Sequence, residues 1–193
     1  MTDLPKLFEF MSLVGQLKRV HRAGWVLRNV SEPESVADHM YRMSVMAFLA
    51  DDKTGLDKNR CIKMALVHDM AESLVGDLTP ADAISKEDKH KHEETAMKYI
   101  CGLLSDELGM ELFNLWEDYE YMRSREAIFV KDLDKFDMIL QAHEYEQLGK
   151  RSGDLQEFFD GTKGKFQTTQ VQEWAEELDR VRMKSGASNS SIK

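Results

Sequence analysis

The sequence predicts an all-α protein with a single domain, and three observations lead to this prediction. The chain has 193 residues, which is enough for one well-buried core and too few for two comfortable domains. It contains only 3 prolines and 11 glycines, so there is little material for the many turns of a sandwich or a barrel. Apolar residues recur at helical spacing along nearly the whole chain. We expect one helical bundle over residues 1–184 with its core at about 35–148, and a disordered polar tail at 185–193.

The first half of the chain predicts three helices. The first is expected to face the core, because its apolar residues follow helical spacing: Leu7, Phe10, Met11, Val14 and Leu17. After an irregular stretch, Ser35 is a predicted N-cap, with Asp38 three residues later forming a box-like start. Asp57 is predicted to cap the third helix, with its inward-facing residues at Ile62, Ala65, Leu66 and Met70.

The second half predicts further helices, separated by clear stop signals. Gly76 and Pro80 interrupt the pattern, and Ser85 then caps a polar helix with acidic residues in its first turn, where the helix dipole favours them. Ser105 is expected to open another helix, and Ser124 a long one that runs to about Leu148. A short element near 155–159 precedes a last helix around 171–181.

Charge and composition exclude several classes of protein. A formal net charge of −9 argues against binding of DNA or RNA as a polymer, because that requires basic surface. No apolar run approaches the roughly 18 residues of a membrane span, and the N-terminal segment interleaves charges with its apolar residues. The two cysteines form no C-x-x-C pair. We therefore expect a cytoplasmic or nuclear protein without a membrane partner.

One basic segment departs from the acidic character of the chain. Residues 10–31 contain no Asp or Glu. They carry five basic residues: Lys18, Arg19, His21, Arg22 and Arg28. The segment is either a solvated face or a contact for a small anionic ligand such as a phosphate.

The stretch "LVHDMAESLVGDLTPAD" places His68 and Asp69 together in an apolar run and adds Glu72 and Asp77. On a helix His68 and Glu72, four residues apart, share one face. An unpaired buried carboxylate is costly, so Asp69 requires a cation or a metal as partner. The sequence therefore predicts a metal site here, with ligands supplied from other helices.

His39 in "ESVADHMYR" is the best further candidate, and "FVKDLDKFDM" offers three more acids. Asp134 lies on one helical line with Val130 and Met138, whereas Asp132 adjoins lysines on a more solvent-like arc. Asp137 also lies among apolar residues. Periodicity favours Asp134 only modestly.

Four segments, "ESVADHMYR", "LVHDMAE", "GDLTPAD" and "FVKDLDK", together resemble the HD-domain metal-dependent phosphohydrolases, whose signature is H…HD…D. The chain is most similar to the eukaryotic HD domain-containing protein 2 branch, which is itself similar to bacterial 5'-deoxynucleotidases. The resemblance extends from about Leu7 to Arg182. It implies His39, His68, Asp69 and Asp134 as ligands of a divalent cation. Such a donor set suits Mn²⁺ or Co²⁺ first, with Mg²⁺, Fe²⁺ and Zn²⁺ as alternatives.

The resemblance also implies roles for residues around the metal. Glu72 and Asp77 match positions linked to catalysis and to the sugar, or to a second cation together with the carbonyl of Leu78. Trp25 and a nearby arginine match the substrate-contacting segment. The spacing "HRAGW" departs from the bacterial form, in which Arg and Trp are adjacent, so Arg22 and Arg28 both remain candidates for the phosphate contact.

The implied activity is hydrolysis of deoxynucleoside 5'-monophosphates by a homodimer. One alternative is a related enzyme acting on nucleoside triphosphates, cyclic nucleotides or guanosine polyphosphates. Activity on cyclic nucleotides is the weaker alternative, because binuclear cyclic phosphodiesterases usually need extra histidines near the HD helix and this chain has only six in all. Another alternative is a helical interaction module without chemistry, against which the intact signature argues. Of the remaining histidines, His90 and His92 are expected on a solvated helix face. Trp25 is expected to stack on a base or to cover the core.

Overall fold

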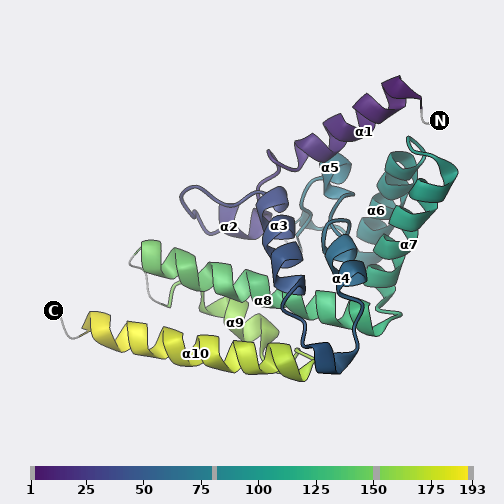
Figure 1. The fold of residues 1–193 in the computed structure, drawn as a ribbon. Coiled ribbons are helices and arrows are strands. Elements are labelled where there is room, and N and C mark those ends of the chain that lie inside the picture. The colour runs from purple at the N-terminus through teal and green to yellow at the C-terminus, as the bar shows by residue number, and fades with distance from the viewer. Residues whose placement is uncertain (1–2, 80–81, 150–152, 191–193) are drawn as a thin grey trace.

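The computed structural model describes residues 3–79, 82–149 and 153–190, and side chains as far as Ser185 (Figure 1). Within these ranges the chain is a helical bundle, and its extended pairing is limited to an isolated bridge between His21 and Ser35. The elements are α1 (Leu4–Gln16), α2 (Ala23–Val26), α3 (Val36–Ala47), η1 (Asp52–Thr54), α4 (Lys58–Ala65), α5 (Glu72–Val75), α6 (Lys86–Cys101), α7 (Asp106–Tyr121), α8 (Arg125–Leu148), α9 (Gln156–Thr162) and α10 (Thr169–Ser190). The all-α prediction is confirmed.

The helix starts follow the capping residues of the sequence. The Ser35 hydroxyl accepts from the Asp38 amide at 3.2 Å, and the Asp38 carboxylate accepts from the Ser35 amide at 2.9 Å, so the predicted capping box is confirmed. Asp57, Ser85 and Ser124 also accept a hydrogen bond from a backbone amide of the helix that each precedes. These caps satisfy amides that have no partner within the helix.

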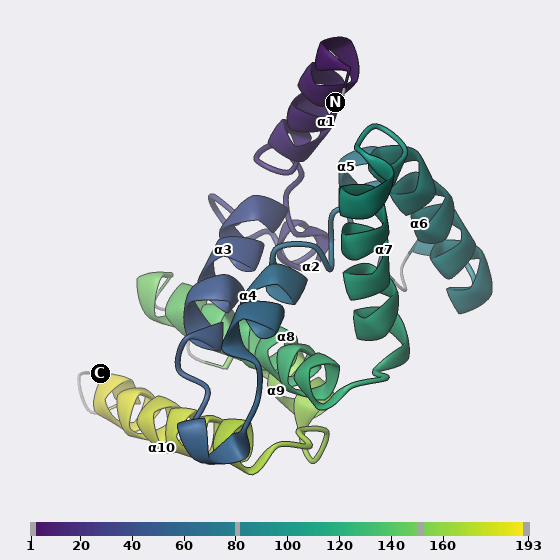
Figure 2. The same ribbon diagram turned by 45° about the vertical axis from the view of Figure 1, so that its right-hand side comes forward.

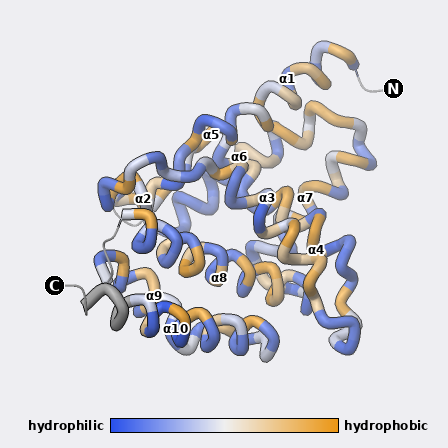
Figure 3. The backbone as a smooth tube through the Cα atoms, turned by 60° about the vertical axis from the view of Figure 1, so that its left-hand side comes forward, coloured by the Kyte–Doolittle hydropathy of each residue, from blue (hydrophilic) through white to orange (hydrophobic). Residues whose placement is uncertain are grey.

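The helix α8 organises the bundle. It packs against α3, α4 and α7 and against α9 and α10. Figure 1 shows it passing beneath α3 and α4, with α9 and α10 on its other side. Val36, Met43, Met64 and Leu133 are completely buried where α3, α4 and α8 meet. In Figure 3 the tube of α8 alternates between hydrophobic and hydrophilic residues, and its buried residues include Asp132 and Asp137 as well as apolar side chains.

The prediction that α1 faces the core is met only in part: Phe10 and Leu13 are half-buried against the core, while Met11 and Val14 are exposed. No residue within α1 is buried, and only Leu17 just beyond its end lies in the core. Among the described helices, α1 packs mainly against α5. Most of its length stands away from the bundle (Figure 2). Its outer apolar residues Leu4, Phe8 and Met11 are left exposed.

The predicted third helix is also shorter than expected. α4 ends at Ala65, and Leu66, predicted to face inward, is 48% exposed. Residues 66–71 continue as tight turns, with i→i−3 hydrogen bonds such as Met70 to Val67 and Glu72 to Asp69. His68 and Asp69 therefore lie in a turn between α4 and α5.

The C-terminal helix extends further than the sequence suggested. α10 is helical through Ser190, into the segment for which we expected disorder, and residues 191–193 of that segment lie outside the described residues. Among the described helices, none is both long enough and apolar enough to cross a membrane.

Candidate metal and phosphate site

Three separate parts of the chain bring the four predicted ligands together. His39 comes from α3, His68 and Asp69 from the turn before α5, and Asp134 from α8. The capping box at Ser35 fixes the start of α3 one turn before His39. The tight turns after α4 point His68 and Asp69 to the same place, although adjacent residues of a helix would lie about 100° apart.

The contact distances define a compact cluster. The Nε2 atom of His39 lies 3.3 Å from Oδ1 of Asp134 and 3.9 Å from Oδ2 of Asp69. The Nε2 atom of His68 lies 3.1 Å from the same Asp69 oxygen. The potential ligand atoms of His39, His68 and Asp134 all lie within 4.8 Å of one another. This is the spacing of a set that can surround one cation.

The hydrogen bonds of the two imidazoles leave the same nitrogen free on each ring. Nδ1 of His39 is 2.7 Å from Oδ2 of Asp137, and Nδ1 of His68 is 2.9 Å from the carbonyl of Ala65. Both partners are acceptors, so each Nδ1 carries a hydrogen and Nε2 is the nitrogen through which each ring would bind a metal. Both Nε2 atoms are buried without a hydrogen-bond partner. Buried polar atoms are nearly always satisfied, and a divalent metal is the partner that fits two imidazoles beside two carboxylates.

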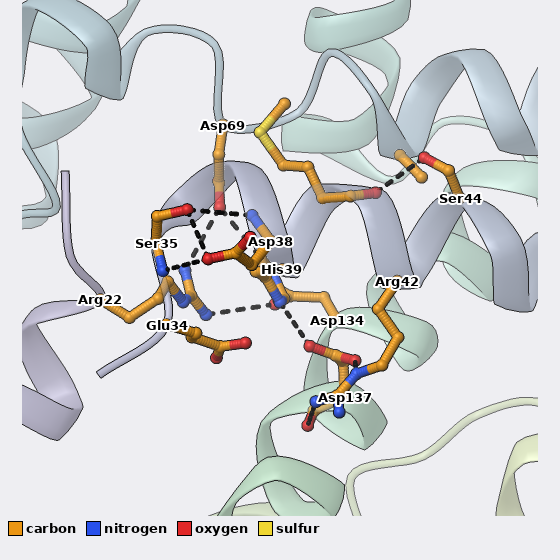
Figure 4. Close-up of polar contacts among 12 residues, drawn as sticks. Arg22, Glu34, Ser35, Asp38, His39, Arg42, Ser44, Asp69, Asp134 and Asp137 are labelled. Carbon is orange, nitrogen blue, oxygen red and sulfur yellow. Dashed lines mark hydrogen bonds and ion pairs between the residues drawn. The ribbon is translucent and has the colours of Figure 1, made fainter. Parts of the chain in front are cut away.

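Arg22 sits between the two carboxylates (Figure 4). Its guanidinium is 3.3 Å from Asp69 and 3.8 Å from Asp134. Burial raises the pKa of Asp134, but the nearby His39, His68 and Arg22 outweigh that effect and hold it well below its ordinary value. Burial also raises the pKa of Asp69, but His68, Arg22 and His39 outweigh it and hold that pKa well below its ordinary value, so both carboxylates are available as charged ligands at neutral pH.

Residues around this cluster orient the ligands. Asp137 receives a hydrogen bond from Arg42 as well as from His39 (Figure 4). The Tyr119 hydroxyl donates to Asp134 at 2.7 Å. Such outer contacts fix the tautomer and direction of metal-binding side chains. Arg42 and Tyr119 were not predicted. The position of Arg42 three residues after His39 was the available signal for the former.

A second acid–histidine group, formed by Glu34, His39 and Asp137, has a structural explanation. Glu34 accepts a 2.9 Å hydrogen bond from the indole nitrogen of Trp25, and Asp137 pairs with His39 and Arg42. Both acids thus already have partners, and through the Asp137–His39 hydrogen bond this group holds His39 in place for the first cluster.

The cluster opens into a polar cavity of about 330 Å³. Glu72 lines this cavity although it is only 4% exposed, and its Oε2 atom has no hydrogen-bond partner. Burial, followed by repulsion from Asp69 and Asp77, raises the pKa of Glu72 well above its ordinary value. Asp77 lies on the same wall and accepts a 2.7 Å hydrogen bond from the amide of Ala23, which ties the start of α2 to the site.

A second, more apolar cavity of about 370 Å³ adjoins the first, and the two share Arg22 and Asp77. Phe158 and Met138 line the second cavity and were not predicted from the sequence. Trp25 also borders it, but Trp25 is only 2% exposed and its ring packs 4.5 Å from that of Phe158. Trp25 was expected either to stack on a base or to cover the core, and its burial matches the second role.

The structure separates the two candidate arginines. Arg22 contacts the carboxylates of the cluster, whereas Arg28 forms a two-point ion pair with Glu157 of α9 at 2.6 and 2.7 Å. Arg28 lines only the apolar cavity. The geometry therefore places Arg22, and not Arg28, beside the predicted metal ligands.

Two surface predictions need correction. Asp132, expected on a solvent-like arc, is completely buried, because it accepts hydrogen bonds from the backbone of Gln167 and Thr168 at the start of α10. His90, expected on a solvated face, lines the polar cavity and stacks on Trp116 with ring centroids 5.6 Å apart. His92 is exposed, as predicted.

The bundle and its His–His–Asp–Asp cluster define a class of protein, and the HD domain family model matches residues 14–174. The chain therefore belongs to the HD domain family. It is 56% identical over 185 residues to the mouse protein named 5'-deoxynucleotidase HDDC2, covering 96% of this chain and 92% of the mouse protein. It is 40% identical to 5'-deoxynucleotidase YGK1 of Saccharomyces cerevisiae, covering 88% of this chain and 80% of the yeast protein.

Solved structures share the fold. A conserved hypothetical protein from Pyrococcus furiosus superposes with a TM-score of 0.74 at 33% identity, over 90% of this chain and 99% of that protein. A protein described as a predicted metal-dependent phosphohydrolase from Magnetospirillum magnetotacticum gives a TM-score of 0.74 at 25% identity, over 96% of this chain and 98% of that protein. The likeness covers the whole bundle.

Proposed function

We propose that this chain is a 5'-deoxynucleotidase that hydrolyses deoxynucleoside 5'-monophosphates to deoxynucleosides and phosphate with the help of a divalent metal. The observation that carries the proposal is the pair of buried, unpartnered Nε2 atoms of His39 and His68 facing two carboxylates. The names of the mouse and yeast relatives support the substrate class.

The proposed metal ligands are His39, His68, Asp69 and Asp134. We propose Mn²⁺ or Co²⁺ as the metal, with Mg²⁺, Fe²⁺ and Zn²⁺ as alternatives, because nitrogen and carboxylate donors together suit these ions better than Ca²⁺. When bound, such a metal acidifies water and offsets charge on a phosphoryl group.

Two further residues have chemical roles in this proposal. The guanidinium of Arg22 lies against Asp69 and Asp134, where it can pair with phosphate oxygens and offset the charge of the transition state. Glu72 lines the same cavity with a carboxyl whose pKa burial raises, so it can hold a proton as well as release one. It would take a proton from the attacking water or deliver one to the leaving 5'-oxygen.

The nucleoside would lie in the apolar cavity, with its base against Phe158 and Met138 and its sugar beside Asp77, which borders both cavities. A 2'-hydroxyl at this boundary would be crowded by the Asp77 carboxylate, which is held in place by the Ala23 amide. This is the proposed origin of a deoxy preference.

The remaining proposals concern setting and assembly. Cys61 and Cys101 are both free and buried, which is consistent with the cytoplasm or the nucleus. We propose a homodimer as the working assembly. We also keep residues 1–184 as the proposed domain.

The substrate proposal is tested by measuring phosphate release from matched deoxynucleoside and ribonucleoside monophosphates with Mn²⁺ present, for the wild type and for Asp77→Ala. The wild type is expected to prefer the deoxy series. Asp77→Ala should raise the relative kcat/KM for the ribo series by about tenfold, equivalent to about 1.4 kcal/mol. Equal release from both series by the wild type would remove the sugar argument. Release from triphosphates or cyclic nucleotides alone would favour the related phosphohydrolase activities.

A further inference from the structure

One arginine and three lysines line the polar cavity. They are Arg22 just before α2, Lys86 and Lys89 on α6, and Lys131 on α8. Arg22 lies against two of the predicted metal ligands, and Lys86 is exposed in the first turn of α6. Lys89 donates a 2.8 Å hydrogen bond to the carbonyl of Leu78. The surroundings of Lys131 differ from those of the other three.

The ammonium of Lys131 is half-buried and has no hydrogen-bond acceptor among the residues that the structure describes. Oε1 of Glu120 lies 3.9 Å away, which is an ion-pair distance and too long for a hydrogen bond. Lys135, one turn further along α8, shows the contrast, because it donates to Asp132 at 2.8 Å and to the carbonyl of Lys165 at 2.9 Å. An ammonium has three donors. Those of Lys131 are left for water or for a ligand in the cavity.

The ring of Tyr119 holds Lys131 beside the metal cluster. The ammonium lies 3.7 Å from the centroid of this ring, a contact in which a cation is attracted to the aromatic face. Tyr119 is only 2% exposed, and its hydroxyl donates to Asp134 at 2.7 Å. Lys131 and Asp134 are three residues apart on α8, so they share one face of the helix. The ammonium is therefore fixed on the α8 wall of the cavity, next to a predicted metal ligand.

We propose that Lys131 contacts the phosphate group of the substrate from α8, together with Arg22 from the start of α2. The two cations come from different elements and line the same cavity. A guanidinium pairs with two oxygens at once, whereas an ammonium is a compact charge that suits a single phosphate oxygen. The assignment rests on the proposed function in that the phosphate is taken to enter this cavity. Inorganic phosphate, a product of the proposed reaction, makes the same contact.

The test is the affinity of inorganic phosphate for the Mn²⁺-loaded full-length chain, measured by calorimetry beside the affinity of Mn²⁺ itself. Lys131→Gln is expected to weaken phosphate binding about tenfold or more, because a hydrogen bond from a charged donor is lost, and to leave the Mn²⁺ affinity unchanged. Lys131→Arg, which keeps the positive charge, should retain most of the phosphate affinity. Lys91→Gln, at an exposed position of α6, is the matched control and should bind both ions as the wild type does.

A folded Lys131→Gln protein that binds phosphate as tightly as the wild type would overturn the proposal. A parallel loss of Mn²⁺ affinity would also overturn it, because Lys131 would then act through Tyr119 and Asp134 and not on the phosphate. A wild-type chain that binds no phosphate with Mn²⁺ present would do so whether or not any variant folds. The ligand is inorganic phosphate, so failure of the deoxynucleotide panel leaves this binding readable. Circular dichroism of each variant establishes that it is folded.

Discussion

Single residues of this site are defined by which of their atoms lack a partner. His39 and His68 each use Nδ1 in a hydrogen bond and leave Nε2 buried and free. The sequence could identify both histidines, because they stand in apolar runs beside acids. It could not show that Asp137 and the Ala65 carbonyl would select the free nitrogen, since those contacts depend on the packing of α3 on α8 and on the turn after α4.

Glu72 offers a prediction at this scale. Glu72→Gln should bind the first metal as the wild type does but lose roughly 100-fold or more in kcat. An amide cannot take up or release the proton that is transferred in general acid–base catalysis. Metal analysis beside steady-state kinetics measures both quantities. Glu87→Gln, at an exposed position of α6, is the control and should be unchanged. Wild-type turnover in Glu72→Gln would remove Glu72 from the proton transfer.

At the scale of elements, the sequence predicted where helices begin but not where α4 ends. Ser35, Asp57, Ser85 and Ser124 begin helices as predicted, because a short polar side chain before an apolar stripe is a local signal. The end of α4 at Ala65 carries no such signal. Its tight turns are needed to point His68 and Asp69 together, which is a requirement of the site and not of local helix propensity.

The attachment of α10 gives a prediction at this scale. Glu146 of α8 is 2% exposed and accepts from Arg182 of α10 at 2.8 Å and from the amide of Leu155 at 3.0 Å. Burial raises the pKa of Glu146, but these hydrogen bonds outweigh it and lower the pKa below the ordinary value. The stabilisation is therefore complete above the unfolded pKa of about 4.3 and is lost as pH falls through the folded value.

We expect Glu146→Gln to destabilise the fold by about 1–3 kcal/mol at pH 7, and the difference from the wild type to shrink below about pH 4. Thermal melts at both pH values measure this. Glu177→Gln, which breaks an exposed pair with Arg180, is the matched control and should change little. A Glu146→Gln effect that persists undiminished at low pH would contradict the role of the charge.

At the scale of the whole molecule, helix content and the metal cluster were predictable, while the cavity wall was not. The four ligands came from motif order along the chain. Lys89, Phe158 and Tyr119 lie on elements whose placement around the cluster is set by α8 and by the α6–α7 pair, so only the packed bundle reveals them. The same reason explains α1: its apolar residues are clear, but the sequence does not say that the bundle covers Phe10 and Leu13 and leaves Leu4, Phe8 and Met11 exposed.

The exposed apolar residues of α1 support the proposed homodimer. Leu4, Phe8 and Met11 of α1 are 64%, 63% and 48% exposed. Large exposed apolar residues on one helix are typical of an interface. We expect light scattering to show a dimer, which Phe8→Glu should convert to a monomer. Lys53→Glu, in η1 at the opposite end of the molecule, should leave it intact (Figure 1). A monomeric wild type, or a dimeric Phe8→Glu, would contradict this interface.

The measurement that tests the central claim most directly is phosphate release from a deoxynucleoside monophosphate by chelated protein as Mn²⁺ is added back. Wild-type protein should be inactive when chelated and recover saturably with Mn²⁺. Asp69→Ala should lose both metal retention and turnover, because one of the four proposed ligands is missing. Release that survives chelation, or a metal-bound Asp69→Ala with normal turnover, would contradict the account.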